Sequence, residues 1–145
     1  MKINIKKLDE NAIIPTYGSK GAAGADLYAL LPDTLTINSG ETVLVRTGIA
    51  MEIPEGFVGL VFARSGLSTK KGLAPANKVG VIDSDYRGEI KVPLFNQSSV
   101  PQVVEKGERI AQIVITPFLS ADFFEVDELG STLRGAEGFG STGRK

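Results

Sequence analysis

The chain is organised around one stretch, Gly80-Val81-Ile82-Asp83-Ser84-Asp85-Tyr86-Arg87-Gly88-Glu89-Ile90-Lys91-Val92. Two β-branched arms flank a polar turn, which predicts a β-hairpin with chemical groups at its tip. Alternation puts Val79, Val81 and Asp83 on one face of the first arm, so Asp83 stands where an apolar side chain is expected. Gly88 supplies the backbone freedom that the turn needs. Taken alone, the Asp-Ser-Asp turn can also serve only to cap its own backbone amides.

The rest of the chain repeats this pattern of short apolar runs and tight turns. Runs rich in Val, Ile, Leu and Thr fill residues 1–60, and they are separated by Pro32-Asp33, Asn38-Ser39-Gly40 and Pro54-Glu55-Gly56. Such spacing predicts strands joined by turns. No long window keeps its apolar residues at helical spacing. We therefore expect an all-β protein, built as an antiparallel sandwich or barrel.

Length and charge limit the classes of protein that the chain can belong to. With 145 residues, of which 42% are hydrophobic, it can bury one core and has no length for a second domain. A net charge of -1 gives no basic surface for a nucleic acid polymer. No apolar run is long enough to span a membrane, and the start, Met1 to Lys7, lacks the apolar centre of a signal peptide. We expect a cytoplasmic protein.

The absence of cysteine and histidine narrows the chemistry further. With Cys 0 and His 0, the chain has no thiol nucleophile, no histidine base and no structural zinc site. A general base must then be Asp or Glu. Any metal must be a hard ion bound by oxygen, such as Mg2+, which often arrives with the phosphates of a substrate. This inventory fits phosphate chemistry.

Four further motifs accompany the central stretch: Ala23-Gly24-Ala25-Asp26-Leu27, Arg64-Ser65-Gly66-Leu67, Gly107-Glu108-Arg109-Ile110-Ala111-Gln112 and Arg134-Gly135-Ala136-Glu137-Gly138-Phe139-Gly140-Ser141-Thr142-Gly143. Together the five resemble, in order, the motifs of the trimeric deoxyuridine triphosphate nucleotidohydrolases (dUTPases). The resemblance spans residues 21–143. It implies a jelly-roll-like antiparallel β-barrel or sandwich that assembles as a homotrimer. It also implies a β domain over residues 1–133 and a flexible arm over residues 134–145.

Three polar residues are candidates for binding phosphate. Arg64 ends an apolar stripe just before Ser65, which can cap a short helix, although a surface arginine before a capping serine is also common. Asp26 can bond a turn or act as a ligand. Gln112 is the sole polar residue of an apolar strand, so it is either a satisfied core glutamine or a phosphate ligand.

The resemblance assigns Arg64, Ser65, Gly66 and Gln112 to the triphosphate. It also places Asp26 in the phosphate and metal region, where it would reach Mg2+ through water while the substrate phosphates hold most of the ion.

The resemblance assigns the nucleoside to the central stretch. It implies that Asn77, the backbone of Val81 and Ile82, and Lys91 recognise uracil, and that Tyr86 packs against the deoxyribose and excludes a 2'-hydroxyl. Fixed backbone donors and acceptors can match uracil O4 and N3–H, whereas the cytosine amine would set a donor against a donor.

The tail, residues 134–145, has a composition that cannot form a core, because it carries four glycines and one aromatic residue. A disordered end is one interpretation. The resemblance implies an arm that closes over the nucleotide. In that arm Arg134 would meet the terminal phosphate, Phe139 would stack on uracil, and Gly140, Ser141 and Thr142 would wrap the phosphates.

The resulting prediction is an enzyme that hydrolyses dUTP to dUMP and pyrophosphate, which lowers dUTP and supplies dUMP for thymidylate synthesis. The resemblance implies that Asp83 activates a water that attacks the α-phosphorus of Mg-dUTP, in sites shared between three chains. Two alternatives remain at this point. One is a relative of deoxycytidine triphosphate deaminase, and the other is a non-catalytic nucleotide sensor.

Overall fold

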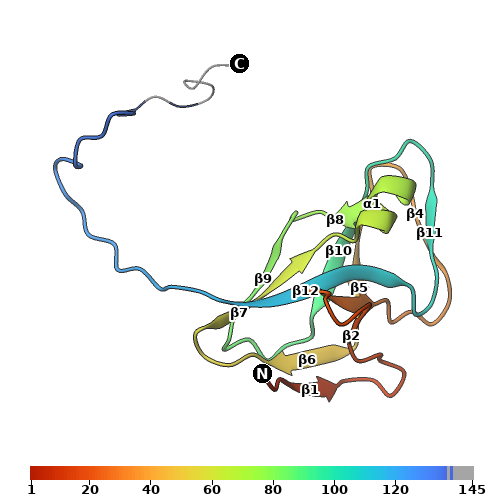
Figure 1. Cartoon of the computed structure of the whole chain (residues 1–145). Coiled ribbons are helices and arrows are strands. Elements are labelled where there is room, and N and C mark those ends of the chain that lie inside the picture. Colours follow the sequence, from red (N-terminus) through yellow and green to blue (C-terminus); the bar gives the residue numbers. More distant parts are fainter. Residues whose placement is uncertain (137, 139–145) are drawn as a thin grey trace.

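The structure, a computed structural model, describes residues 1–136 and 138. Over these residues the chain forms twelve strands and one short helix, which confirms the all-β prediction (Figure 1). In chain order the elements are β1 (Asn4–Lys7), β2 (Thr16–Tyr17), β3 (Ala25–Tyr28), β4 (Leu35–Ile37), β5 (Thr42–Arg46), β6 (Ile49–Glu52), β7 (Phe57–Phe62), α1 (Ser65–Lys71), β8 (Leu73–Pro75), β9 (Gly80–Ile82), β10 (Lys91–Asn96), β11 (Gln102–Val104) and β12 (Arg109–Pro117).

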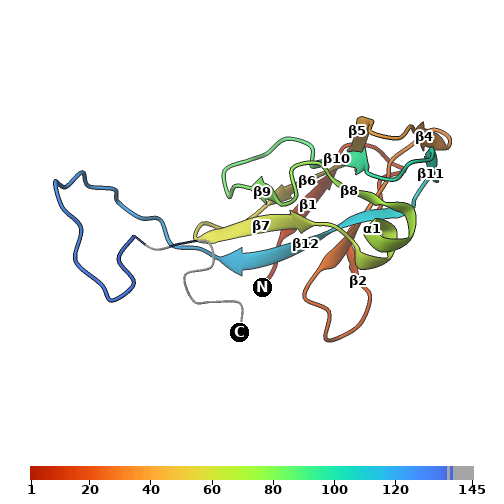
Figure 2. The same cartoon turned by 90° about the horizontal axis from the view of Figure 1, so that it is seen from above.

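The strands form four sheets, and every pairing among them is antiparallel. The largest sheet has the order β2-β3-β12-β7-β9, and the second has the order β5-β10-β8. Two small sheets, β1-β6 and β11-β4, complete the domain. Figure 2 shows β7 and β12 side by side along the length of the large sheet.

One apolar core joins the two larger sheets. Alternate residues of their strands face inward and are almost fully buried: Leu27, Val61 and Ile113 from the large sheet, and Val45, Val92 and Leu94 from the second. Burial of these side chains is the main favourable term for the fold, at about 1.5–3 kcal/mol for each large side chain. The sites described below lie at the margins of this core.

The prediction that residues 80–92 form a hairpin is wrong. β9 pairs with β7, whereas β10 pairs with β5 and β8, so residues 83–90 cross from one sheet to the other. Alternation marks each arm as a strand but does not select its partner. The partner is decided by which sheet edge receives each arm once Ile90 and Val92 are buried in the common core.

The prediction that Val79, Val81 and Asp83 share one face of the first arm is correct, but that face is not the apolar, buried one. Val79, Val81 and Asp83 are all exposed, with 60% of Val81 accessible, while Gly80 is buried against Val61. Asp83 therefore does not replace a core residue. It continues a strand face that is exposed to solvent.

The predicted short helix is present as α1, but Ser65 is not its cap. Arg64 occupies the N-cap position with an extended backbone and makes no side-chain capping bond. Ser65 is the first helical residue, and its carbonyl accepts hydrogen bonds from the hydroxyls of Ser68 and Thr69. The helix ends at Gly72, whose left-handed backbone (φ 66°) stops the turn.

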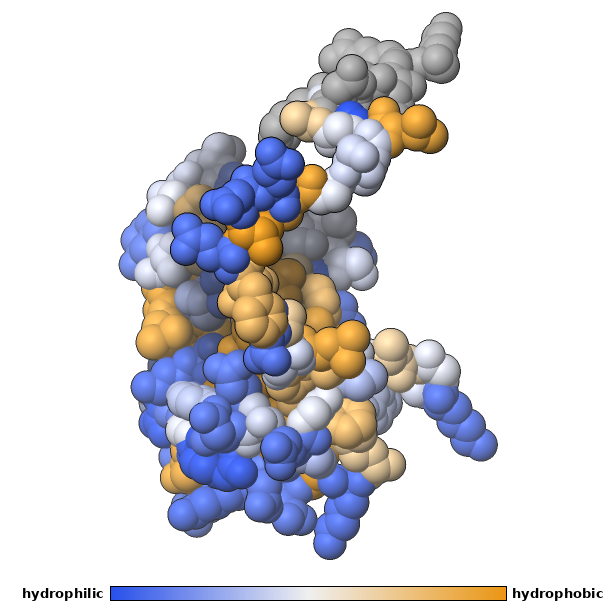
Figure 3. Space-filling view, turned by 90° about the vertical axis from the view of Figure 1, so that its left-hand side faces the viewer, coloured by the Kyte–Doolittle hydropathy of each residue, from blue (hydrophilic) through white to orange (hydrophobic). Residues whose placement is uncertain are grey.

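Beyond Pro117 the described residues run away from the domain (Figure 1). This segment, residues 118–136, exposes large apolar side chains, including Leu119 (96%), Phe123 (95%) and Leu129 (88%). Figure 3 views the molecule from the side that this segment leaves and shows hydrophobic side chains at the surface there. No helix within the described part of the chain is long and apolar enough to cross a membrane.

Candidate functional site

Two pockets contain residues predicted from the motifs, and the first, here called the Arg64 pocket, lies where β3, β12 and the end of β7 meet. Its volume is about 190 Å3. Its lining is Gly18, Ala22, Gly24, Asp26, Arg64, Ser65, Arg109 and Gln112. Four of the residues predicted from the motifs, Asp26, Arg64, Ser65 and Gln112, are thus brought together, although they are up to 86 positions apart in the chain.

Asp26 organises the cations of this pocket. Arg64 Nε donates to Asp26 Oδ1 at 2.6 Å, and Arg109 Nη1 donates to Asp26 Oδ2 at 3.2 Å. Arg64 Nη1 also donates to the carbonyl of Arg109 at 3.4 Å. Asp26 is 7% exposed, so this carboxylate is withdrawn from water and fixes two guanidinium groups at the pocket wall.

Arg109 belongs to this pocket, and the sequence analysis assigned it no role. Simple alternation along β12 sets positions 109 and 112 on opposite faces. The register shows a bulge between Arg109 and Ala111, because those residues pair with Tyr28 and Leu27, which are adjacent in β3. The extra residue turns Arg109 onto the face of Gln112. It also explains why the consecutive residues Ile110 and Ala111 are both buried.

Gln112 combines features of its two predicted roles. Its Nε2 donates to the carbonyl of Ala63 at 2.9 Å, as expected for a satisfied glutamine on a partly buried strand. The side chain nevertheless lines the Arg64 pocket. A Cβ atom added to Gly24 would lie 2.5 Å from Gln112 Oε1, so a side chain at residue 24 would shift this amide from its present position.

The second pocket, here called the Asp83 pocket, lies over the crossing between the two larger sheets and has a volume of about 340 Å3. Its lining is Leu44, Val81, Ile82, Asp83, Tyr86, Glu89, Ile90 and Lys91. Five predicted residues, Val81, Ile82, Asp83, Tyr86 and Lys91, are therefore gathered here. The pocket combines apolar walls with one free acid and one lysine.

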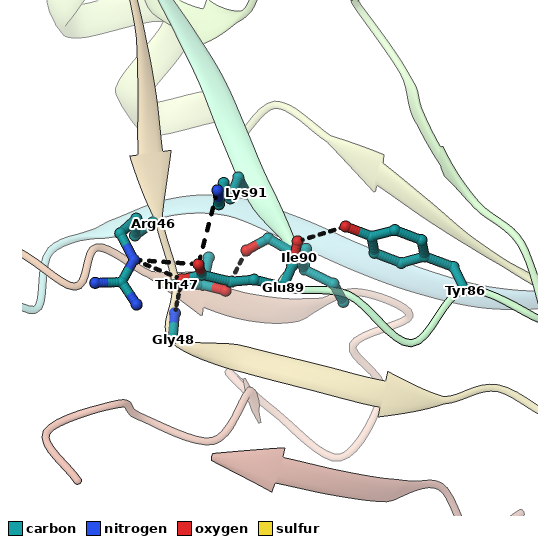
Figure 4. A network of polar contacts seen from close by, with 7 residues as sticks. All are labelled: Arg46, Thr47, Gly48, Tyr86, Glu89, Ile90 and Lys91. Carbon is teal, nitrogen blue, oxygen red and sulfur yellow. Dashed lines mark hydrogen bonds and ion pairs between the residues drawn. The ribbon is translucent and has the colours of Figure 1, made fainter. Parts of the chain in front are cut away.

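A network of polar contacts is centred on Glu89, one of the residues that line the Asp83 pocket (Figure 4). The Glu89 carboxylate accepts hydrogen bonds from Gly48 N at 2.9 Å and Arg46 Nε at 3.0 and 3.1 Å. Lys91 Nζ lies 3.9 Å from the same carboxylate. Tyr86 donates its hydroxyl to the Glu89 carbonyl at 2.9 Å. Glu89 therefore ties the crossing to the turn that follows β5.

Asp83 stands apart from this network. Its carbonyl accepts the amide of Tyr86 at 3.2 Å, which closes a turn. Within residues 1–136 and 138, no side chain or amide engages the carboxylate itself, and the side chain is exposed. The carboxylate can therefore hold and orient a water at the mouth of the pocket.

Several predicted residues lie elsewhere. Asn77 is exposed just before β9 and is not part of the Asp83 lining, and Gly66 is exposed with no atom near its open face. Arg134 lies in the segment that leaves the domain. Outside the described residues are Phe139, Gly140, Ser141 and Thr142.

The two pockets are separate within one chain, and none of the described residues lines both. Gly59 pairs with Ile82, so Asp83 lies beside Val58, six residues before Arg64. Six residues of extended chain span about 20 Å. The acid and the arginine therefore lie at opposite ends of β7.

The chain resembles known dUTPases in sequence. A sequence model of the dUTPase family matches residues 10–143. A deoxyuridine 5'-triphosphate nucleotidohydrolase from Hydrogenobaculum sp. (strain Y04AAS1) is 51% identical over 145 residues, with full coverage of both chains. Another, from Desulfitobacterium hafniense (strain DSM 10664 / DCB-2), is 53% identical over 144 residues, which is 99% of this chain and 95% of that protein.

Solved dUTPase structures share the fold. A variant of the Staphylococcus bacteriophage 80alpha dUTPase with dUpNHpp superposes with a TM-score of 0.89 and 30% identity, covering 98% of each chain. A variant dUTPase from phage phi11 of S. aureus, described with a structural Mg(II) ion, gives a TM-score of 0.81 at 26% identity, covering 90% of this chain and 100% of that one. The jelly-roll-like fold expected from the motifs is thereby confirmed.

Proposed function

The chain belongs to the dUTPase family and hydrolyses dUTP to dUMP and pyrophosphate, and we propose that Asp83 activates the water that attacks the α-phosphorus. The single observation that carries this assignment is the exposed carboxylate of Asp83, which lines the Asp83 pocket and has no bonding partner among the described residues. The base must bind the attacking water directly, so its carboxylate oxygens must be open to that water. Asp26, the other candidate acid, is engaged by two arginines.

The Arg64 pocket is proposed to receive the triphosphate. Arg64 and Arg109 present fixed positive charge, and Ser65 and Gln112 add hydrogen-bonding groups on the same wall. Charges that are held in place before the reaction stabilise the charge that develops on a leaving pyrophosphate. Arg134 from the C-terminal arm is proposed to add a further cation at the terminal phosphate.

Mg2+ is the proposed cofactor. Among the residues that the structure describes, no group of three or more acidic side chains gathers to hold a metal, and both oxygens of Asp26 already bond arginines. This donor set fits an ion held mainly by the substrate phosphates, with Asp26 contributing through water. When bound, the ion supplies positive charge to the triphosphate.

The Asp83 pocket is proposed to receive the nucleoside. The backbone of Val81 and Ile82, together with Lys91 and Asn77, would select uracil, and Tyr86 would pack on the deoxyribose where a 2'-hydroxyl would clash. The lining of apolar walls and a phenol supports this proposal, because a nucleoside needs one flat apolar contact and a few placed polar groups.

We further propose a homotrimer with shared sites, in which one chain supplies the Asp83 pocket, a second the Arg64 pocket and a third the arm. The separation of about 20 Å along β7 supports sharing, since a single nucleotide must meet both pockets. The exposed apolar side chains of residues 118–133 also call for a covering surface. An arm over residues 134–145 and a cytoplasmic location remain predictions.

A product assay tests the activity. The purified protein is incubated with Mg2+ and, separately, with dUTP, dCTP, dTTP or UTP, and the products are separated. Pyrophosphate from dUTP alone is the expected result. Formation of dUTP from dCTP would indicate a deaminase, and binding without turnover would indicate a sensor.

Mixing two variants, each expected to have lost most of its activity, tests whether sites are shared. Asp83→Asn and Arg64→Ala are unfolded together in equal amounts and refolded. In a cyclic trimer each shared site has one chance in four of drawing a sound Asp83 and a sound Arg64, so about a quarter of wild-type activity should return. Recovery of no activity, despite light scattering that demonstrates trimers, would refute sharing and leave the hydrolase activity untouched.

A further inference from the structure

Tyr86 and Gly88 are in unusually close contact within the crossing, residues 83–90. A Cβ atom added to Gly88 would lie 2.4 Å from Tyr86 Oη, 2.6 Å from Cζ and 2.9 Å from Cε2. Cβ atoms essentially never approach other heavy atoms below 3.0 Å. The phenol ring therefore rests against the bare Cα of Gly88.

The backbone at residue 88 does not itself require glycine. Gly88 is absent from the glycines with positive φ, so an L-residue can adopt its backbone conformation. The expectation that Gly88 supplies backbone freedom is therefore wrong. What the position requires is space, and the atoms that occupy the space belong to Tyr86.

The other end of the ring is held by a hydrogen bond. Tyr86 donates its hydroxyl to the Glu89 carbonyl at 2.9 Å, with the hydroxyl directed at that oxygen in Figure 4. The Glu89 side chain is only 11% exposed and is tied to Gly48 N and Arg46 Nε. The acceptor for the phenol is thus part of a fixed network, and the ring has one defined position.

We propose that Gly88 is a positioning residue for sugar specificity: its missing side chain sets where the Tyr86 ring stands in the Asp83 pocket. This inference rests on the proposed role of Tyr86 in excluding a 2'-hydroxyl. In Gly88→Ala, the new Cβ and Tyr86 Oη would have to separate from 2.4 Å to an ordinary contact of 3.4 Å or more, which moves the hydroxyl end of the ring by about 1 Å. A hydroxyl oxygen is excluded by contact alone, so a shift of that size weakens the exclusion.

The test compares four proteins as full-length chains: wild type, Gly88→Ala, Tyr86→Ala and the double variant. The readout is the ratio of kcat/KM for dUTP to kcat/KM for UTP. Gly88→Ala should lower this ratio about 10- to 100-fold, up to the scale known for a misplacement of about 1 Å. In the Tyr86→Ala background the same change should have no further effect. Gly130→Ala, whose Cβ meets nothing within 4 Å, is the matched control and should keep the wild-type ratio.

The outcomes separate the inference from its premise. If Tyr86→Ala lowers the ratio and Gly88→Ala leaves it unchanged or raises it, the inference fails while the role of Tyr86 stands. If Tyr86→Ala leaves the ratio unchanged, the sugar role fails and takes the inference with it. A further loss from Gly88→Ala in the double variant would mean that Gly88 acts without Tyr86, which also overturns the inference.

Circular dichroism and thermal melting decide the case in which Gly88→Ala does not fold. Folding of the double variant would then support the inference, because removing the ring would have relieved the clash. Failure of both variants to fold would overturn it, since the space at residue 88 would then serve the backbone rather than Tyr86.

Discussion

The Arg64 pocket and the Asp83 pocket each contain an aspartate, but the two carboxylates differ in burial and in bonding partners. In the Arg64 pocket, Asp26 is buried on a central strand and both of its oxygens bind guanidinium groups, at 2.6 and 3.2 Å. In the Asp83 pocket, Asp83 sits on a crossing between sheets and its carboxylate has no partner among the described residues. The first acid positions other groups, and the second is available to react.

The secondary structure that supports each pocket also differs. The Arg64 pocket is built on neighbouring strands of one sheet: Asp26 and Arg109 lie in the ladder between β3 and β12, and Arg64 follows the end of β7. The Asp83 pocket depends on a turn and on the network of Glu89, which fixes backbone rather than charge. A group that must bind phosphate benefits from rigid support, whereas a base must keep its lone pairs open to water.

The largest expected effect concerns the free acid. Asp83→Asn should lower kcat by about 10²–10⁴, the range for loss of a general base, while KM for dUTP changes only a few-fold. Steady-state kinetics measures both constants. Asp85→Asn is the matched control, because Asp85 lies in the same turn but does not line the pocket. Equal damage from the two variants would contradict the assignment of the base.

Asp26→Asn should have the next largest effect, on stability as well as activity. It removes the charge that pairs with Arg64 and Arg109, and we expect a loss of about 1–3 kcal/mol in the free energy of unfolding, since both guanidinium groups are partly exposed. The value of kcat/KM should fall about 10- to 100-fold as the arginines lose their positions. Urea unfolding and kinetics measure the two effects.

The control for this change is Asp33→Asn, at an exposed turn acid whose one bond, to Thr34 N, asparagine can keep. If Asp26→Asn were as mild as this control, Asp26 would not be the organiser of the Arg64 pocket.

Gly24→Ala should have a smaller effect, confined to the Arg64 pocket. Its Cβ would displace Gln112 Oε1 from 2.5 Å, and the bond from Gln112 Nε2 to Ala63 would be strained. A loss of about tenfold in kcat/KM is expected for one displaced ligand. Gly18 lines the same pocket, but a Cβ added there would meet nothing within 4 Å, so the control variant Gly18→Ala should behave as wild type. No difference between the two variants would remove Gln112 from the phosphate site.

Glu89→Gln is expected to have the smallest effect. The amide keeps one acceptor for Gly48 N but loses the charge that pairs with Arg46, which is half exposed. We expect a cost of about 0.5–1.5 kcal/mol and a change in kcat of less than about threefold, because the Glu89 carbonyl still receives the Tyr86 hydroxyl. Thermal melting against Glu55→Gln, at an exposed turn, measures this difference. A large loss of activity would mean that the Glu89 carboxylate does more than hold the crossing.

Sequence reasoning named many of the residues that line the two pockets but missed Arg109. Asp83, Arg64 and Gln112 drew attention as polar residues beside or within apolar runs, and the resemblance to dUTPases supplied their expected roles. Arg109 was missed because a bulge reverses the alternation between it and Gln112. The extra residue of a bulge cannot be recognised from a single sequence. The motif that contains Arg109 was nevertheless recognised, and that is the signal that could have found it.

The sequence by itself determined the local features: short strands, tight turns, an all-β class, the absence of thiol and imidazole chemistry, and the residues of five motifs. Each of these follows from residue types and short spacings. Only the tertiary structure decided that β9 and β10 join different sheets, that Asp26 pairs with two arginines, and that Gly88 makes room for Tyr86. Those outcomes depend on which distant segments meet, because strand pairing and side-chain contact are set by burial in a common core rather than by neighbours in the chain.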